Sequence, residues 1–259
     1  MASEDKRTLL RGPGLSLLIA TLLLGGCSLI EGEGFYTREK VEGNGNIVTE
    51  KRSLPSFHTL RNEAPVDIRL VKNKAEVHVR SDSNLLSLIG TEVRNGVLKV
   101  HLEEPVKNTE VRKVLVPSKN LGKIENDGAG DIAGKKRFRW GIMKIQDEGA
   151  GDIKLHLSAE ELHYKGEGSG DAMFRGNVKQ LTIDNDGSGD VLALNLMAEK
   201  VYCGSEGSGD VKVDATVDLK VESEGSGDVV YKNPPPNIEV HSEGSGDVRV
   251  WEKKEKKEK

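Results

Sequence analysis

The chain has 259 residues, of which 30 are glycine and only 4% are aromatic, and its formal net charge is −4. This charge and the absence of a basic patch in the sequence do not favour a nucleic-acid partner. Two cysteines cannot form a disulfide framework, and the glycine-rich, aromatic-poor composition argues against an ordinary globular enzyme and favours a repeat protein.

The first 26 residues have the layout of a secretory signal peptide. Lys6, Arg7 and Arg11 form a basic start, and an apolar run follows over residues 15–24. A helix of about ten residues is too short to cross a bilayer core of about 30 Å. The sequence therefore predicts a cleaved signal over residues 1–26 rather than a permanent membrane span.

The signal ends in Leu24-Gly25-Gly26-Cys27, which resembles the lipobox of bacterial lipoproteins. The resemblance implies cleavage before Cys27 and lipidation of its thiol, with residues 27–42 as a tether. Two or three acyl chains anchor a protein firmly where one is marginal. The alternative is an ordinary signal with a chance cysteine.

The residue after the cysteine bears on where such a lipoprotein resides. An Asp at this position favours retention in the inner membrane of enteric bacteria, and this chain has Ser28 instead. We therefore expect a lipid-anchored protein of the cell envelope, in the outer membrane rather than the inner one.

A five-residue motif, acidic-Gly-small-Gly-Asp, dominates the second half of the chain. Successive copies begin 21, 19, 19, 20, 18 and 19 residues apart, and a period near 20 is typical of solenoids. The seven copies stand at residues 127–131, 148–152, 167–171, 186–190, 206–210, 224–228 and 243–247.

Apolar and polar residues alternate on both sides of each motif, which is the period of a half-buried strand. Each repeat therefore predicts a strand, a Gly corner, a second strand and a less regular corner. We expect an all-β fold, a β-solenoid of the parallel β-helix type with coils of about 19 residues. Cys203 falls in an inward column and is expected in the core. An antiparallel sheet with hairpins at the glycines is the competing topology.

The predicted domain covers residues 43–251, in two parts. Residues 121–251 hold the seven coils, and residues 43–120 are strand-like with irregular turns, including a hairpin or corner at Asn95-Gly96. The first part is either the opening coils of the solenoid or a capping sheet, because solenoids need their apolar ends covered. Residues 252–259 form a charged tail.

The opening residues of this domain carry a family resemblance. Residues 41–48 (VEGNGNIV), then Lys51-Arg52 and Phe57, followed by the Gly-Ser-Gly-Asp repeats, resemble the head GIN domain family over residues 41–250. That family is described as adhesins of the autotransporter type and as a domain of unknown function. The resemblance implies a β-helical fold on a secreted or lipid-anchored bacterial protein.

The acidic corners are the candidate site with chemistry. Stacked like charges about 4.8 Å apart repel by about 1 kcal/mol even in water, and Ca²⁺ would offset this, because it prefers carboxylate and carbonyl oxygens. The alternative is that each Asp accepts backbone N–H bonds in its own turn. The candidate ligands are Asp131, Asp152, Asp171, Asp190, Asp210, Asp228 and Asp247.

No nucleophile–base set is evident, and we expect no catalytic residues and no cofactor other than the candidate calcium. The leading hypothesis is a non-enzymatic scaffold that binds an unknown protein or glycan partner. One alternative is a β-helix polysaccharide-active enzyme, which usually breaks its repeat at one coil with a basic residue and clustered acids; the repeats here look nearly uniform. Another is an envelope structural protein without a soluble ligand.

Overall fold

The computed structural model describes residues 40–72, 74–107 and 111–252. Within them the chain is all-β, with 18 strands and one short 3₁₀ helix. The described residues all belong to one compact unit. The predicted signal peptide, Cys27 and most of the tether and tail lie outside the described residues.

The first part of the domain contains nine short strands and the helix. These are β1 (Val41–Glu42), β2 (Ile47–Arg52), β3 (Thr59–Asn62), β4 (Asp67–Val71), β5 (Val77–Asp82), η1 (Leu86–Leu88), β6 (Ile89–Arg94), β7 (Val97–Leu102), β8 (Val106–Lys107) and β9 (Lys113–Pro117).

The second part contains the repeat strands. These are β10 (Lys123–Asn126), β11 (Ile132–Asp147), β12 (Ile153–Gly166), β13 (Ala172–Asn185), β14 (Val191–Ser205), β15 (Val211–Ser223), β16 (Val229–Tyr231), β17 (Asn237–Ser242) and β18 (Val248–Val250).

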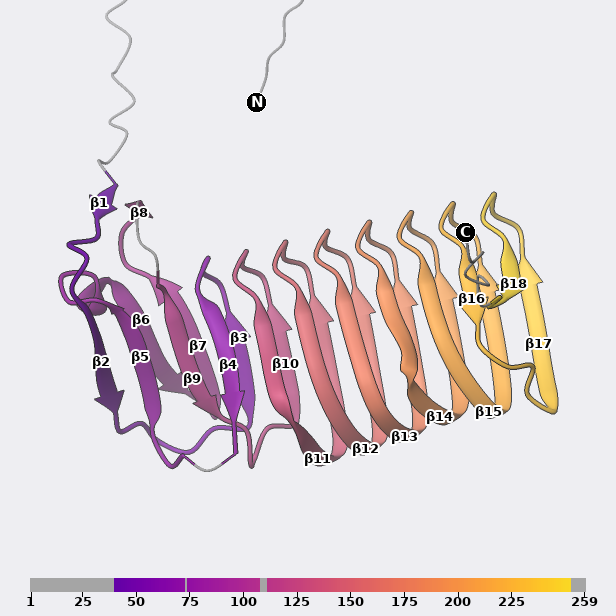
Figure 1. The fold of residues 1–259 in the computed structure, drawn as a ribbon, viewed down its shortest axis with the longest axis horizontal. Helices are drawn as coiled ribbons and strands as arrows, with labels where there is room; N and C mark the ends of the chain where they lie inside the picture. The colour runs from indigo at the N-terminus through magenta and orange to yellow at the C-terminus, as the bar shows by residue number, and fades with distance from the viewer. Residues whose placement is uncertain (1–39, 73, 108–110, 253–259) are drawn as a thin grey trace, which may run out of the picture. The chain divides into compact units, whose positions relative to one another are not determined.

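The predicted parallel β-solenoid is confirmed. Strands β10 to β18 pair in parallel, each with the strand one coil away, and the coils stack side by side with the motif corners along one edge (Figure 1). The second, irregular corner is absent from the central coils, because β11 to β15 each bend without a break and supply both faces of a coil.

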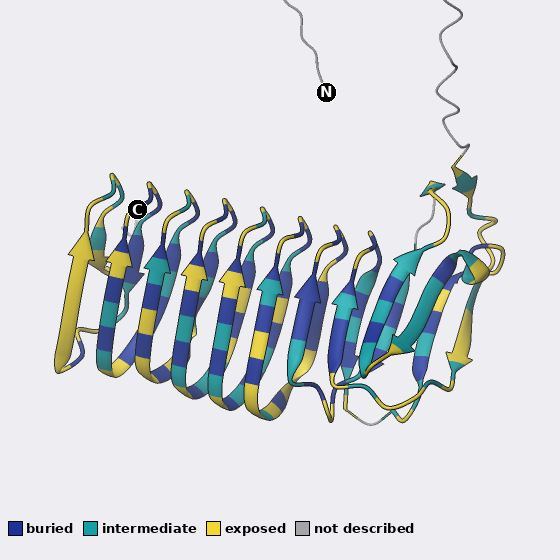
Figure 2. Ribbon diagram, turned by 180° about the vertical axis from the view of Figure 1, so that it is seen from behind, coloured by how far each residue is buried: buried dark blue, intermediate teal, exposed yellow. Residues whose placement is uncertain are grey.

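The core is built from ladders of apolar residues that repeat once per coil. One ladder runs Ile132, Ile153, Ala172, Val191 and Val211, all fully buried. Figure 2 shows buried and exposed residues alternating along these strands, as expected where one side of each strand faces the core. Burying each Val or Ile side chain contributes about 1.5–3 kcal/mol.

The first part contains both an opening coil and a capping sheet, the two alternatives that the sequence left open. Strands β3 and β4 form the opening coil, because β3 pairs in parallel with β10 and β4 pairs in parallel with β11. Beyond them β2, β5 and β9 pair antiparallel, and so do β6 and β7. The β6–β7 connection is the predicted hairpin, with positive φ at Asn95 (51°) and Gly96 (76°). This antiparallel sheet caps the solenoid.

The other end of the solenoid is open. All six residues of β17 are exposed, including the apolar Ile238 and Val240 at 45% each, and Figure 2 shows this strand as the edge of the stack. Of the part of the chain that the structure describes, no helix has the length and apolar character needed to cross a membrane.

Candidate functional site

The last Asp of each motif belongs to a hydrogen-bonded ladder along the corner edge. The backbone N–H of each Asp donates to Oδ1 of the Asp one coil earlier, over 2.9 to 3.0 Å in most steps and 3.4 Å in the first. The acceptor role matches the sequence-based alternative, but the donor is the next coil rather than the residue's own turn. The ladder contains Asp67, Asp131, Asp152, Asp171, Asp190, Asp210, Asp228 and Asp247.

The first member of this ladder reveals a corner that the motif search missed. Residues 62–67 (NEAPVD) occupy the place that residues 126–131 (NDGAGD) occupy one coil later, since Asp131 N–H bonds to Asp67 Oδ1 and Asp127 N–H bonds to the Asn62 carbonyl. The sequence signal for this corner was the shared Asn, the acidic residue after it (Glu63) and the final Asp.

Close stacking explains why the seven later corners need glycine. Their glycines do not have positive φ. A Cβ added to Gly207 or Gly209 would instead overlap the carbonyl oxygen of the matching glycine in the preceding coil. The first corner has no such neighbour, because β7 continues towards β8, so Ala64 and Val66 fit there and are buried in the core.

The calcium hypothesis gains no geometric support from the described residues, and the hydrogen bonds of the ladder favour the alternative of backbone acceptance. The second oxygens of Asp152, Asp210 and Asp228 accept hydrogen bonds from lysine or arginine side chains two residues further on, or one coil on. In the described ranges no group of three or more His, Cys, Asp or Glu side chains is placed to hold a metal ion. Backbone N–H groups and neighbouring cations therefore offset much of the ladder's negative charge.

A second, buried polar column runs inside the corner edge. Asn62 Nδ2 donates to Asn126 Oδ1 over 3.1 Å, and Asn126 Nδ2 donates to Asp147 Oδ1 over 3.0 Å. Asp147 Oδ2 is buried and has no hydrogen-bond partner in the described structure. Burial raises the pKa of Asp147 to about 6, against smaller lowering effects from Asn126 and the Gly149 N–H.

Three steps of the described stack shift register, from β11 to β12, from β13 to β14 and from β14 to β15, and the first of these carries a run of basic residues. Between β11 and β12, Gly134 pairs with Leu155 and Phe138 pairs with Leu157, so β11 holds two extra residues in a bulge. This is the coil whose motif spacing is 21, and the bulge carries Lys135, Lys136 and Arg137. The expectation of uniform coils therefore does not hold here. Bulges of this kind re-aim side chains and are features rather than defects.

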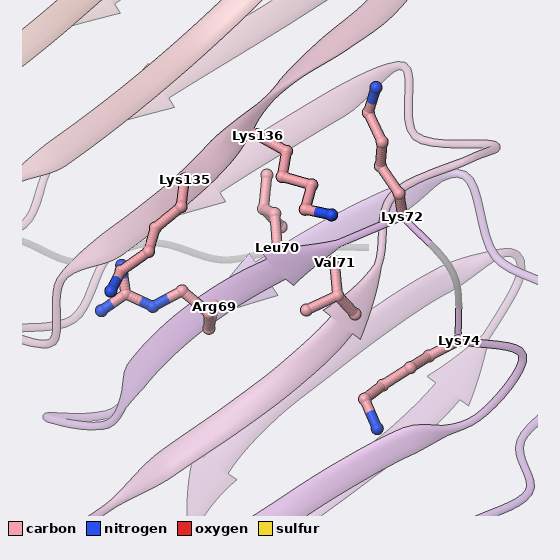
Figure 3. Close-up of a pocket in the computed structure, with 7 residues that line it drawn as sticks. All are labelled: Arg69, Leu70, Val71, Lys72, Lys74, Lys135 and Lys136. Carbon is pink, nitrogen blue, oxygen red and sulfur yellow. The ribbon is translucent and has the colours of Figure 1, made fainter.

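The bulge borders a hollow of about 360 Å³, shown in Figure 3. Leu70 and Val71 of β4 supply its apolar lining. Five cations surround it, with Lys135 and Lys74 at opposite ends of the view. They are Arg69, Lys72, Lys74, Lys135 and Lys136.

Two further hollows adjoin this one through shared residues. A hollow of about 220 Å³ shares Arg69 and Lys135 and adds Lys154 and Arg175, and another of about 260 Å³ shares Lys72. The second of these adds Lys119 and Arg139. We call the three together the basic groove. It has nine cationic side chains in its lining and no carboxylate.

Most of these cations lack a carboxylate partner within the described residues. Among the nine, only Lys154 forms an ion pair, with Asp152 at 2.7 Å. Several lysines elsewhere on the coils are paired, as in Lys200–Asp218 at 3.1 Å and Lys232–Asp214 at 3.1 Å. No basic patch in the sequence favours a nucleic-acid partner, and folding gathers these cations from segments that lie far apart in the chain.

Aromatic packing holds the bulge rigidly. Phe138 is buried and fills the space beside Gly134 that a side chain there would occupy. Its ring stacks on Trp140 with centroids 5.2 Å apart, and Lys72 Nζ lies 5.9 Å from the Phe138 centroid. Trp140 Nε1 donates to the Ser118 carbonyl over 3.1 Å. The cations therefore project from a fixed base.

The predictions for the two cysteines, Cys27 and Cys203, have different outcomes. Cys203 is buried in the core as predicted, and burial raises its pKa to about 12, so its thiol stays protonated and unreactive. Cys27 lies outside the described residues, so its lipidation stays a prediction.

Comparison with known proteins agrees with this architecture. A crystal structure of a putative adhesin from Bacteroides fragilis superposes with a TM-score of 0.75 at 22% identity, covering 82% of this chain and all of the other. A putative lipid binding protein from Parabacteroides distasonis gives a TM-score of 0.67 at 24% identity, covering 83% of this chain and all of the other. Curated protein sequences give no match.

A family model extends across most of the domain. The model described as "Putative auto-transporter adhesin, head GIN domain" matches residues 56–235, a range that contains the first corner, six of the seven Gly corners and the whole basic groove. The sequence resemblance is thereby confirmed, and the chain belongs to the head GIN domain family.

Proposed function

We propose that this protein is a lipid-anchored scaffold of the cell envelope that binds a partner without catalysing a reaction. The observation that carries the binding role is the basic groove, where cations without carboxylate partners line connected hollows on a rigid coil. Concave sites with a few convergent polar groups are the usual form of binding sites. The family's description as adhesins supports the same class of function.

The repeated corner supports a structural role for the remaining acidic residues. Each ladder Asp before Asp247 accepts the N–H of the next coil, so these carboxylates maintain the stack. A polysaccharide-active enzyme is the second candidate, because the bulge does break the repeat with basic residues. However, the clustered acids that accompany such sites do not line the groove, so we favour binding.

The anchoring half of the proposal depends on Cys27 and the apolar signal before it. The test is labelling of expressing cells with a radioactive fatty acid, followed by membrane fractionation. We expect the wild type to be labelled and membrane-bound, and Cys27→Ala to lose the label. Cys203→Ala is the matched control and should keep the label, because Cys203 is a buried core residue. An unlabelled wild type would contradict the anchor.

A further inference from the structure

The basic groove concentrates positive charge, and of its nine cations only Lys154 has a carboxylate partner in the described chain. The pKa of His156 shows the local effect: partial burial lowers it first, and Arg175, Arg137 and Lys72 lower it further. Because like charges in one hollow repel, their arrangement costs free energy unless an anion offsets it. The arrangement is also built in, since it depends on the bulge in β11.

The shape of the groove indicates an extended ligand. Its three hollows lie in a connected series and involve residues of β4, β11, β12 and β13. A single small anion would need one hollow, whereas a linear chain can place successive charged units in connected ones. The half-buried Val71 and the exposed Met173 add apolar surface for the C–H face of a sugar ring.

The aromatic residues argue against a nucleic acid. Single-stranded nucleic acids bind by stacking bases on open aromatic faces. Here Phe138 is buried and one of its faces is covered by Trp140 at an interplanar angle of 12°, so the half-buried Trp140 offers the groove a single aromatic face rather than a series for successive bases. A lipid surface is a poorer fit as well, because a flat array of headgroups does not enter concave hollows.

We propose that the basic groove binds an anionic polysaccharide, a chain whose sugar units carry carboxylate or sulfate groups. This inference names the ligand class of the proposed binding function and rests on it. Lys135, Lys136 and Arg175 would contact the anionic groups, and the apolar lining would contact the sugar rings.

The test uses the full chain in detergent and isothermal titration calorimetry. The probes are oligogalacturonate, which carries carboxylates, and heparin oligosaccharides, which carry sulfates, with dextran as the neutral comparison. We expect at least one charged probe to bind, dextran not to bind, and the affinity to fall as salt rises, because salt screens exposed charges.

Charge reversal locates the site. The double variant Lys135→Glu/Lys136→Glu should weaken binding by at least about tenfold. The control Lys144→Glu/Lys179→Glu makes the same change in net charge at exposed positions outside the groove, and should stay within about twofold. If the first variant fails to fold, as judged by circular dichroism, Lys135→Ala/Lys136→Ala replaces it.

Several outcomes would overturn the proposal. These are no binding of either charged probe, equal weakening in both double variants, or tighter binding to oligo-dT or phosphatidylglycerol vesicles that is lost in Lys135→Glu/Lys136→Glu and so depends on the groove rather than on the lipid anchor. Shortening of the oligosaccharide would instead confirm the ligand class and overturn the non-enzymatic role. The Cys27→Ala experiment is independent of all these outcomes, so failure of the anchor and failure of the glycan site can be distinguished.

Discussion

The corner edge and the basic groove carry opposite charges on the same solenoid, and the charged groups differ in the partners they have. At the corners the Asp carboxylates recur in every coil, and each accepts a backbone N–H from its neighbour. In the groove the cations come from the bulge in β11 and from the coils beside it, and they mostly lack partners. The difference teaches that in this repeat protein the repeated charge maintains the stack, while the exceptional charge is available to a ligand.

The largest expected loss of stability comes from a substitution that breaks the stacking of the corners. Gly207→Ala should destabilise the fold by about 3 kcal/mol, because its Cβ would overlap the Gly187 carbonyl oxygen in the coil below. Gly141→Ala is the matched control, since a Cβ there meets nothing within 4 Å, and should stay within about 0.5 kcal/mol. Urea unfolding measures both, and equal effects would refute the close-approach explanation.

The next effect tests the buried column behind the corners. The folded-state pKa of Asp147 is about 6, above its ordinary 3.8, so the folded state holds the proton more tightly than the unfolded state. Stability from this group is therefore greatest below about pH 4, falls as the pH rises towards about 6, and is constant above that.

Asp147→Asn should thus stabilise the protein by about 2 kcal/mol at pH 7.5 and by almost nothing at pH 3.5. The new amide would continue the pattern in which Asn126 donates to the Gly151 carbonyl and Asn185 to that of Gly209. Thermal melting across this pH range measures the gain. A gain independent of pH would show that Asp147 is not the titrating group.

A smaller effect isolates one step of the ladder. Asp190→Ala should cost about 1 kcal/mol, because the Asp210 N–H loses its acceptor at 2.9 Å. Asp190→Asn retains Oδ1 and should cost less. If chemical denaturation gives the two variants the same stability, the hydrogen bond is not what the residue contributes.

Calcium should have the smallest effect. With one oxygen of each ladder Asp already accepting an N–H, we expect the same Tm in millimolar calcium and in chelator. A rise of several degrees that disappears in Asp190→Asn/Asp210→Asn would instead establish the cation ladder.

The regular coils were predictable because their signals are local. Glycine pairs, a terminal Asp and alternating apolar residues recur at a fixed period, and these are the features that stacking requires. The motif search missed the first corner because Ala64 and Val66 stand in place of its glycines. Side chains fit there only because no corner of a preceding coil lies against them. The strand pairing of the cap could not be predicted, because antiparallel pairs such as β2 with β5 depend on contacts between segments that are distant in the sequence.

The basic groove could be predicted only in part. The spacing of 21 and the run Lys135-Lys136-Arg137 were visible in the sequence and together indicate an insertion of exposed cations. The contribution of Arg69 and Lys72 was not visible, because it depends on β4 pairing with β11. The missing carboxylate partners are likewise a property of the folded surface.

Deleting Lys135 and Lys136 tests the central distinction most directly, because it restores a 19-residue spacing in the bulged coil. Melting of the full chain and titration with the charged oligosaccharides should be measured on the same sample. Our account predicts a folded protein with nearly unchanged Tm and loss of polyanion binding. A large fall in Tm would show that the stack needs the bulge for its stability. Retained polyanion binding would show that the ligand binds outside the basic groove.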